Sequence, residues 1–301
     1  MLVAFVPIWV LTGLGWLTGR RGLLGAEAER VLGGFVLHLA MPAALFTALS
    51  RSRLSFHPGA LGAFAVGATL TMALGFLLCA GPLRRGPGEA TIGAMAAGYV
   101  NSANLGIPVA LHVLGDVTFL TEVLLFQVLV VTPVILVLLD RAAGQALRPG
   151  RLASMPLRNP VIAGLALGAL SSALRWSPPQ WLAGPLDLLG AAAVPTALVA
   201  LGLSLTTAGP RSAAAGGEVA ALCGLKLLVQ PALAGLAGWA VGLDRTALLA
   251  VVVCAALPTA QNTWVYAAGY AQGESVARRT VLVSTGLSMV TLAVAGWVLG
   301  G

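Results

Sequence analysis

The chain has 301 residues, of which 58% are hydrophobic and only 9% are charged, and its mean hydropathy is +0.93. Soluble domains carry about 25% charged residues, so most of this surface cannot face water. Intrinsic disorder is excluded because the apolar content is too high. The net charge of +7 does not indicate nucleic-acid binding, because the arginines stand singly or in pairs and form no basic stripe. The composition therefore predicts an all-α integral membrane protein.

The apolar runs predict ten transmembrane helices, at about 20 residues for each span. In chain order they lie near residues 2–19, 31–50, 57–81, 89–112, 119–139, 159–175, 182–206, 216–242, 246–269 and 277–300. The longest polar segment separates two blocks of five spans. We therefore expect a first repeat over residues 1–139, a cytoplasmic linker over 140–158 and a second repeat over 159–301.

The distribution of positive charge predicts the orientation of these spans. Met1–Trp16 contains no charged side chain, whereas a secretory signal begins with positive charge, so we expect a retained first span with its N-terminus outside. Cytoplasmic loops are enriched in Lys and Arg. The orientation places twelve arginines in the cytoplasm: Arg20, Arg21, Arg30, Arg84, Arg85, Arg141, Arg148, Arg151, Arg158, Arg211, Arg278 and Arg279. Only Arg51, Arg53, Arg175 and Arg245 are left outside, and the even number of spans puts the C-terminus outside too.

An internal repeat relates the two blocks. Ala40–Leu45 matches Ala193–Leu198 at four of six positions, and Gly106–Ala110 weakly resembles Ala256–Ala260 at nearly the same offset. The two matching segments that begin at Ala40 and Ala193 each lie in the second span of their block. The segments that begin at Gly106 and Ala256 each lie in the fourth span. Because each block has an odd number of spans, the second enters the membrane upside down. Inverted repeats of this kind are typical of secondary transporters.

The fourth and ninth spans carry polar residues in their middles. The fourth contains Asn101, Ser102, Asn104, Gly106 and Pro108, and the ninth contains Pro258, Gln261, Asn262 and Thr263. An unpaired amide in hydrocarbon costs several kcal/mol, and a proline removes a backbone donor. Matched broken helices with amides predict a substrate site at the middle of the membrane that favours an anion, with the glycine and the two prolines as helix breakers. The simpler alternative is two proline kinks whose amides join neighbouring helices.

Other small and kinking residues favour a packing role. Pro42 and Pro195 have few polar neighbours and predict kinks in a scaffold. The pair Gly33 and Gly34 and the pair Gly164 and Gly168 predict close contacts between helices.

The ionisable residues are informative by position. No carboxylate lies at the centre of a predicted span, which argues against a carboxylate site for a coupling proton or sodium ion. Lys226 is the exception among the cations, about ten residues into the eighth span. Either it snorkels to the interface, or it is a fixed positive charge that attracts an anionic substrate or replaces a coupling cation. The three cysteines lack metal-ligand spacing, so neither a metal nor another cofactor is expected.

These residues resemble the auxin efflux carrier family, which includes plant PIN-type exporters and bacterial carriers described as transporting malonate and similar acids. The resemblance covers nearly the whole chain. It is carried by Asn101 with Gly106–Pro108, Asn159–Pro160, Leu189–Pro195 continuing to Gly202, Lys226–Pro231, and Ala256–Pro258 followed by Tyr266 and Tyr270.

The resemblance implies a fold of ten helices in two inverted five-helix repeats. Spans 1, 2, 6 and 7 would form a scaffold, often dimeric, and spans 3–5 and 8–10 a transport domain. The substrate carboxylate would sit where the fourth and ninth spans cross, in an elevator-type cycle. By position, Asn101 matches the carboxylate-binding asparagine of the family, and Pro108 and Pro258 match the helix breakers. Thr263 and Gly269 depart from the plant pattern, which makes auxin doubtful as the substrate and favours a bacterial carrier of the inner membrane.

The sequence therefore predicts a secondary transporter of a small carboxylate, with the lipid bilayer as its surroundings and a homodimer through the scaffold. The substrate-binding residues would be Asn101, Ser102, Asn104, Lys226, Gln261, Asn262 and Thr263. The alternatives are a sodium- or proton-coupled symporter of the bile-acid or antiporter-like fold, and a non-transporting membrane sensor. An enzyme is not expected, because the serine, metal and paired-aspartate motifs of intramembrane enzymes are missing.

Overall fold

The computed structural model describes residues 2–25, 27–51, 56–144, 160–204, 206 and 216–300. Within these ranges the backbone is helical apart from turns and one isolated β-bridge, which confirms the all-α class. Six helical stretches are long and apolar enough to cross a membrane: Ala28–Arg51, Pro58–Ala80, Thr118–Ala142, Gln180–Leu203, Gly216–Ala240 and Glu274–Gly296. The chain is therefore a multi-pass membrane protein. Most of the predicted linker falls in residues 145–159, which lie outside the described ranges.

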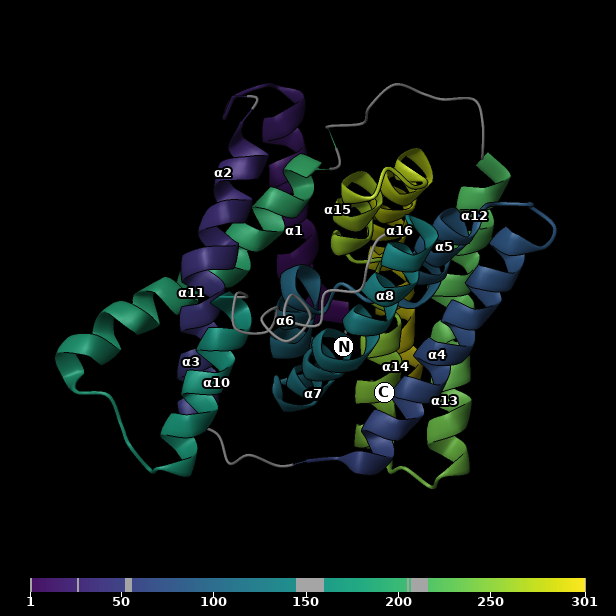
Figure 1. The fold of residues 1–301 in the computed structure, drawn as a ribbon. Helices are drawn as coiled ribbons and strands as arrows, with labels where there is room; N and C mark the ends of the chain where they lie inside the picture. Colours follow the sequence, from purple (N-terminus) through teal and green to yellow (C-terminus); the bar gives the residue numbers. More distant parts are fainter. Residues whose placement is uncertain are drawn as a thin grey trace.

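One group of helices brings together the predicted spans 1, 2, 6 and 7 (Figure 1). It contains α1 (Leu2–Arg20), α2 (Ala28–Phe35), η1 (Val36–Ala40), α3 (Met41–Arg51), α10 (Pro160–Ala173) and α11 (Gln180–Ser204). Within this group α1 packs along α11, and α3 packs against both α10 and α11. An exposed ion pair joins α3 to α11, with 2.8 Å between Arg51 Nη2 and Asp187 Oδ2.

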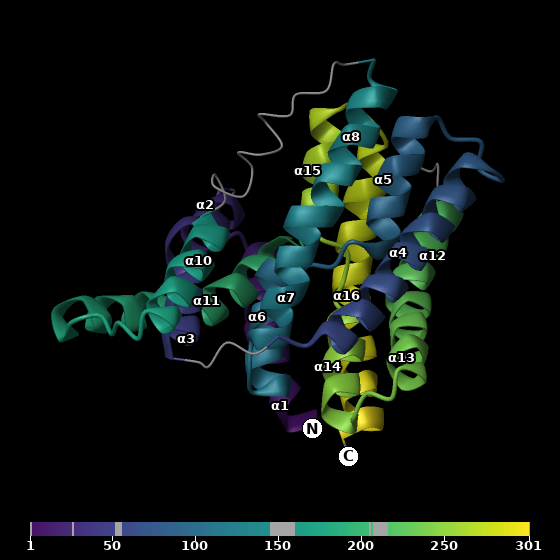
Figure 2. The ribbon, with the colours of Figure 1, turned by 60° about the horizontal axis from the view of Figure 1, so that its bottom comes forward.

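A second group contains the helices of the predicted spans 3, 5, 8 and 10 and parts of spans 4 and 9. They are α4 (Pro58–Ala80), α5 (Pro87–Gly98), α7 (Thr118–Phe126), η4 (Gln127–Val131), α8 (Thr132–Ala142), α12 (Gly216–Gly224), η5 (Leu225–Val229), α13 (Gln230–Ala240), α14 (Arg245–Ala255), α15 (Asn262–Gly269) and α16 (Glu274–Gly300). Both views place α4, α12 and α13 at the edge of the molecule opposite α10 and α11 (Figures 1 and 2).

The two groups meet mainly along a short helical stretch. It consists of η2 (Ser102–Gly106), α6 (Ile107–Val109) and η3 (Ala110–Leu114). Here α6 and η3 contact α1, η2 and α6 contact α11, and α1 also contacts α16 of the second group. Buried side chains such as Leu105 and Leu198 belong to one hydrophobic cluster that runs across this junction. The contact between the groups is therefore apolar and narrow compared with the packing inside each group.

Glycines set the closest helix contacts of the first group. A Cβ built on Gly202 would overlap the Thr12 carbonyl oxygen of α1, and one built on Gly164 would overlap the backbone at Pro42. The prediction of close contacts at Gly164 and Gly168 is thus confirmed, since a Cβ on Gly168 would lie 2.8 Å from the Phe46 carbonyl oxygen. The same prediction for Gly33 and Gly34 is wrong, because a Cβ on either glycine would meet nothing within 4 Å. Small residues permit close packing only where a second helix is present.

Four prolines follow a widened helical turn. Pro42, Pro108, Pro133 and Pro231 each lie two residues after a π-helical turn, namely η1, η2, η4 and η5. Proline removes an N–H and collides with the carbonyl four residues earlier. A π turn inserts one extra residue and moves that carbonyl aside, so the helix continues. Pro195 instead lies inside α11 without such a turn.

We expect Gly202→Ala to destabilise the protein by about 1–3 kcal/mol, because the new methyl group overpacks the contact between α1 and α11. The measurement is thermal unfolding in detergent. Gly33→Ala is the matched control, because the new methyl meets nothing within 4 Å and alanine is the better helix former. Equal melting temperatures for the two variants would contradict the assigned contact.

Candidate functional site

Two helices stop in the interior and their broken segments pair with each other. α5 ends at Gly98 and α14 at Ala255, and helical backbone resumes at Ser102 and Asn262. Between these ends, Val100 and Thr259 form an antiparallel β-bridge. The Asn101 N–H donates to the Pro258 carbonyl at 2.8 Å, and the Ala260 N–H donates to the Tyr99 carbonyl at 3.0 Å. Each break therefore satisfies backbone groups of the other, as a nonpolar interior requires.

Side chains from neighbouring helices fix this bridge from two sides. Gln127, on η4, donates from Nε2 to the Val100 carbonyl at 3.0 Å and accepts from the Ser102 hydroxyl at 2.9 Å. Ser284, on α16, accepts a hydrogen bond from the Thr259 N–H at 3.1 Å. Gln127 and Ser284 are both buried. Side chains of η4 and α16 thus hold the bridged segments in place.

The carbonyls at the ends of the broken helices are capped by side chains. The Thr259 hydroxyl donates to the Ala96 carbonyl at 2.7 Å, and Gln230 Nε2 donates to the Gly98 carbonyl at 3.0 Å. Both acceptors belong to α5, whereas both donors come from the second half of the chain.

Lys226 caps the other broken helix. Its Nζ lies 2.8 Å from the carbonyl oxygen of Ala255, the last residue of α14. A positive charge at a helix C-terminus is favourable because the helix dipole is negative there. The side chain is 0% exposed, so Lys226 does not snorkel to the membrane surface. Its amino group lies instead beside the crossing.

The predicted site residues lie around this crossing at different depths. Asn101 and Ser102 are buried at the start of η2, and Thr263 is fully buried in the first turn of α15. Gln261 is half-buried and Asn262 is exposed. Asn104 belongs to the same turn as Ser102, and its side chain lies outside the described part of the structure.

The break in the fourth span lies ahead of Gly106 and Pro108, not at them. Helical backbone has already resumed at Ser102, and Pro108 lies inside α6. The π turn before this proline absorbs its steric conflict, so no break is required there. Pro258, in contrast, lies within the broken segment and accepts a hydrogen bond from Asn101. The two prolines aligned by sequence therefore occupy different places relative to the crossing.

Three buried carboxylates lie near helix ends. Glu122 accepts from the ring nitrogen Nδ1 of His57 at 2.9 Å, and Asp140 accepts from the Tyr270 hydroxyl at 2.5 Å. Glu218, at the start of α12, accepts from Arg85 Nη2 at 2.7 Å. This hydrogen bond and the charge of Glu218 raise the pKa of Arg85 further above its ordinary value. Among the described residues, no group of three His, Cys, Asp or Glu side chains is arranged to hold a metal ion.

Four residues that hold the crossing were not among the predicted site residues: Gln127, Gln230, Thr259 and Ser284. The two glutamines carried a usable signal, because each is an amide inside an apolar span shortly before a proline. The threonine belongs to the polar segment that follows Pro258 in the ninth span, whereas the serine carried no signal, since hydroxyl side chains commonly bond to their own helix.

Comparison with known proteins finds relatives that match nearly the whole chain. The family model described as "Membrane transport protein" matches residues 1–295. A protein of Rhizobium meliloti named "Putative malonate transporter" is 30% identical over 95% of this chain and 92% of its own length. A protein of Methanothermobacter thermautotrophicus named "Uncharacterized transporter" is 27% identical over 95% of this chain and 94% of its own.

We expect Gln127→Leu to lower the free energy of unfolding by about 1–3 kcal/mol, because it leaves a buried carbonyl without its donor. Leu129→Met, on the same π turn and exposed, is the control. Thermal unfolding of the two variants measures the difference. In a double-mutant cycle with Ser102→Ala, we expect a coupling of at least about 0.5 kcal/mol. Additive effects would show that the bond between Ser102 and Gln127 contributes nothing.

Proposed function

Because the chain belongs to the membrane transport protein family, which is the auxin efflux carrier family predicted from the sequence, we propose that it is a secondary transporter of a small organic carboxylate. Members of this family are membrane transporters and not enzymes. The observation that carries the proposal is the pair of broken helices bridged at Val100 and Thr259. Broken helices of this type form the binding sites of many carriers. Malonate is the first candidate substrate, because one relative is named for it.

The substrate carboxylate would bind beside the starts of η2 and α15. The N-termini of helices attract anions through their unpaired N–H groups and their dipoles. Asn101, Ser102, Asn104, Gln261, Asn262 and Thr263 would line this position. The Thr263 hydroxyl supports the assignment, because it is buried and has no hydrogen-bond partner within the described residues.

Lys226 would contribute a fixed positive charge. It hydrogen-bonds to the end of α14, and the ion pairs of the described residues give it no carboxylate partner. A buried cation without a counter-ion favours an anion nearby. The three buried carboxylates lie near helix ends and have other partners, which supports transport that does not depend on a carboxylate proton or sodium site.

The chain would cross the membrane ten times as two inverted repeats, residues 1–139 and 159–301. The matching segments around Pro42 and Pro195 lie in α3 and α11 of the first group, as two halves of a symmetric scaffold would. The second group would move past this scaffold as an elevator, and the narrow apolar junction between the groups supports such sliding. A homodimer would form through the scaffold helices.

The arginine distribution supports an orientation with both termini outside a bacterial inner membrane. The turn after α4, which contains Arg84 and Arg85, would then face the cytoplasm, as would the start of α12.

The function is tested by flux in proteoliposomes with labelled malonate and related mono- and dicarboxylates. We expect Asn101→Ala to reduce uptake by about tenfold or more, since a hydrogen bond to a charged group is worth about 1.5–3 kcal/mol. His38→Gln, on an exposed residue of the first group, is the control. Uptake should be the same with and without sodium and without a pH gradient.

Each alternative has its own outcome in this experiment. Uptake that requires a sodium or proton gradient would favour the coupled symporter. Saturable binding of a carboxylate without flux would favour the membrane sensor. Neither binding nor flux for any acid, with no effect of Asn101→Ala, would refute the proposed function.

We further expect Pro258→Ala to reduce transport more than it reduces the yield of folded protein. An alanine can supply the missing N–H and extend α14 into the broken segment, which would close the site. Pro195→Ala, in an exposed position of α11, is the matched control. The measurements are flux per folded molecule and melting temperature. A parallel loss of yield and flux would show that Pro258 is only structural.

A further inference from the structure

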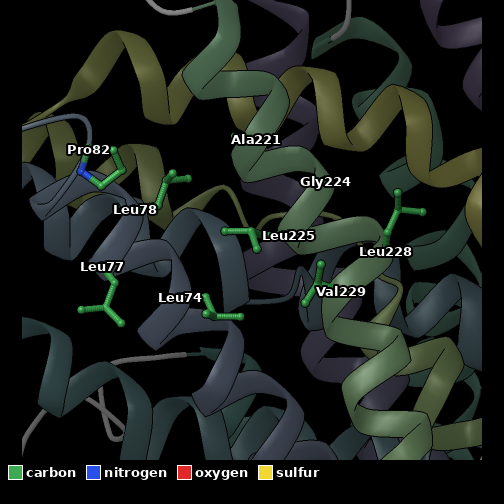
Figure 3. Close-up of a pocket in the computed structure, with 9 residues that line it drawn as sticks. All are labelled: Leu74, Leu77, Leu78, Pro82, Ala221, Gly224, Leu225, Leu228 and Val229. Atoms are coloured by element: carbon green, nitrogen blue, oxygen red, sulfur yellow. The ribbon is translucent and has the colours of Figure 1, made fainter.

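An apolar groove lies on the outer face of the second group, away from the crossing. Nine residues line it, and all are apolar (Figure 3). Leu74, Leu78 and Pro82 belong to α4 and the turn that follows it, and Gly224, Leu225 and Leu228 belong to α12 and η5. Its volume of about 640 Å³ is within the range of ligand pockets, roughly 300–1,000 Å³.

The lining excludes a polar ligand and favours a hydrocarbon chain. No side chain in it donates or accepts a conventional hydrogen bond. The wall runs over nine residues from Leu74 to Pro82, and its helical part, from Leu74 to the end of α4 at Ala80, rises roughly 9 Å at 1.5 Å per residue. One leaflet of a bilayer has about 15 Å of hydrocarbon, half of the full core. The helical wall thus covers more than half of one leaflet, which suits the part of an acyl chain nearest one face of the membrane.

An exposed positive charge follows the groove's lining in the sequence. Arg84 is two residues beyond Pro82, is exposed, and makes no ion pair within the described residues. The turn that carries it is fixed, because the Leu83 N–H donates to the Leu78 carbonyl and the Arg85 N–H donates to the Cys79 carbonyl at 2.8 Å. The adjacent arginine is already paired with Glu218 at 2.7 Å. Arg84 is therefore available to an anion at the level of the lipid headgroups.

We propose that this groove binds one acyl chain of an anionic phospholipid whose phosphate pairs with Arg84. Long apolar walls with a basic residue at the membrane surface match the two parts of such a lipid. Both overall views place α4 and α12 at the edge opposite α10 and α11, so the groove is open to the bilayer (Figures 1 and 2). One wall is η5, the turn from which Lys226 reaches α14, so the bound chain stabilises the support of the crossing.

Two substitutions separate the parts of this site. Gly224→Leu fills the groove, because a Cβ on this glycine meets nothing within 4 Å. Arg84→Gln removes the charge and leaves the groove open. The matched controls are Gly62→Leu, on the same helix as Leu74 and also facing open space, and Arg21→Gln, another exposed arginine just beyond a helix end. Leu228→Ser, on a side chain that is 64% exposed, replaces Gly224→Leu if that variant does not fold.

The experiment uses delipidated full-length protein in detergent. Melting temperature and lipid retained in native mass spectrometry are measured with phosphatidylglycerol, with phosphatidylcholine of the same chains, and with free oleate. We expect phosphatidylglycerol to raise the melting temperature of the parent and control proteins by several degrees more than phosphatidylcholine does. Gly224→Leu should abolish this shift for all three additives, and Arg84→Gln should remove only the preference for phosphatidylglycerol. Oleate should bind the parent less tightly than the phospholipid.

Three results would overturn the proposal. Equal shifts of the melting temperature with both phospholipids would show that Arg84 does not select an anionic headgroup. An unchanged shift in Gly224→Leu would show that the lipid does not bind in the groove. A change of oligomeric mass in Gly224→Leu would make the groove an interface with a second copy. Because these readouts do not require transport, they are independent of the substrate proposed above.

Discussion

The structure depends on one constraint, which is that backbone polar groups inside a membrane have no water to bond with. A helix that stops in mid-membrane exposes carbonyls at its end and N–H groups at the next start. Here the two interrupted helices solve the problem jointly, through the bridge between Val100 and Thr259 and through capping by Gln230 and Lys226. Four surrounding segments, η4, η5, α13 and α16, each deliver a donor or an acceptor to this crossing.

The sequence was sufficient to predict the class of protein, its family and the two segments that are interrupted. Composition and span length were enough to predict a membrane protein. The amides around Asn101 and Asn262 were enough to predict the two interrupted segments. It was not sufficient for the position of the fourth-span break. Pro108 is the obvious helix breaker in the sequence. The helix is instead interrupted at Tyr99–Asn101, where Val100 forms a β-bridge with Thr259. Pairing between distant segments decides such a break, and no local pattern encodes it.

The π-helical turns explain why the positions of proline residues did not predict where the helices break. A proline can end a helix, bend it, or be absorbed by one extra residue in the preceding turn, and all three outcomes have the same local sequence. In this chain the absorbed prolines have a further effect, because the π turns before them carry Ser102, Gln127 and Lys226. Each of these residues makes a hydrogen bond at the crossing.

The exchange of caps between the halves has a consequence for how the protein is made. The Ala96 and Gly98 carbonyls belong to the half that leaves the ribosome first, but their donors, Thr259 and Gln230, are synthesised more than a hundred residues later. Neither carbonyl can receive its cap during that interval, and an uncapped carbonyl in lipid is costly. The crossing can therefore reach its final hydrogen bonding only after Thr259 has been synthesised.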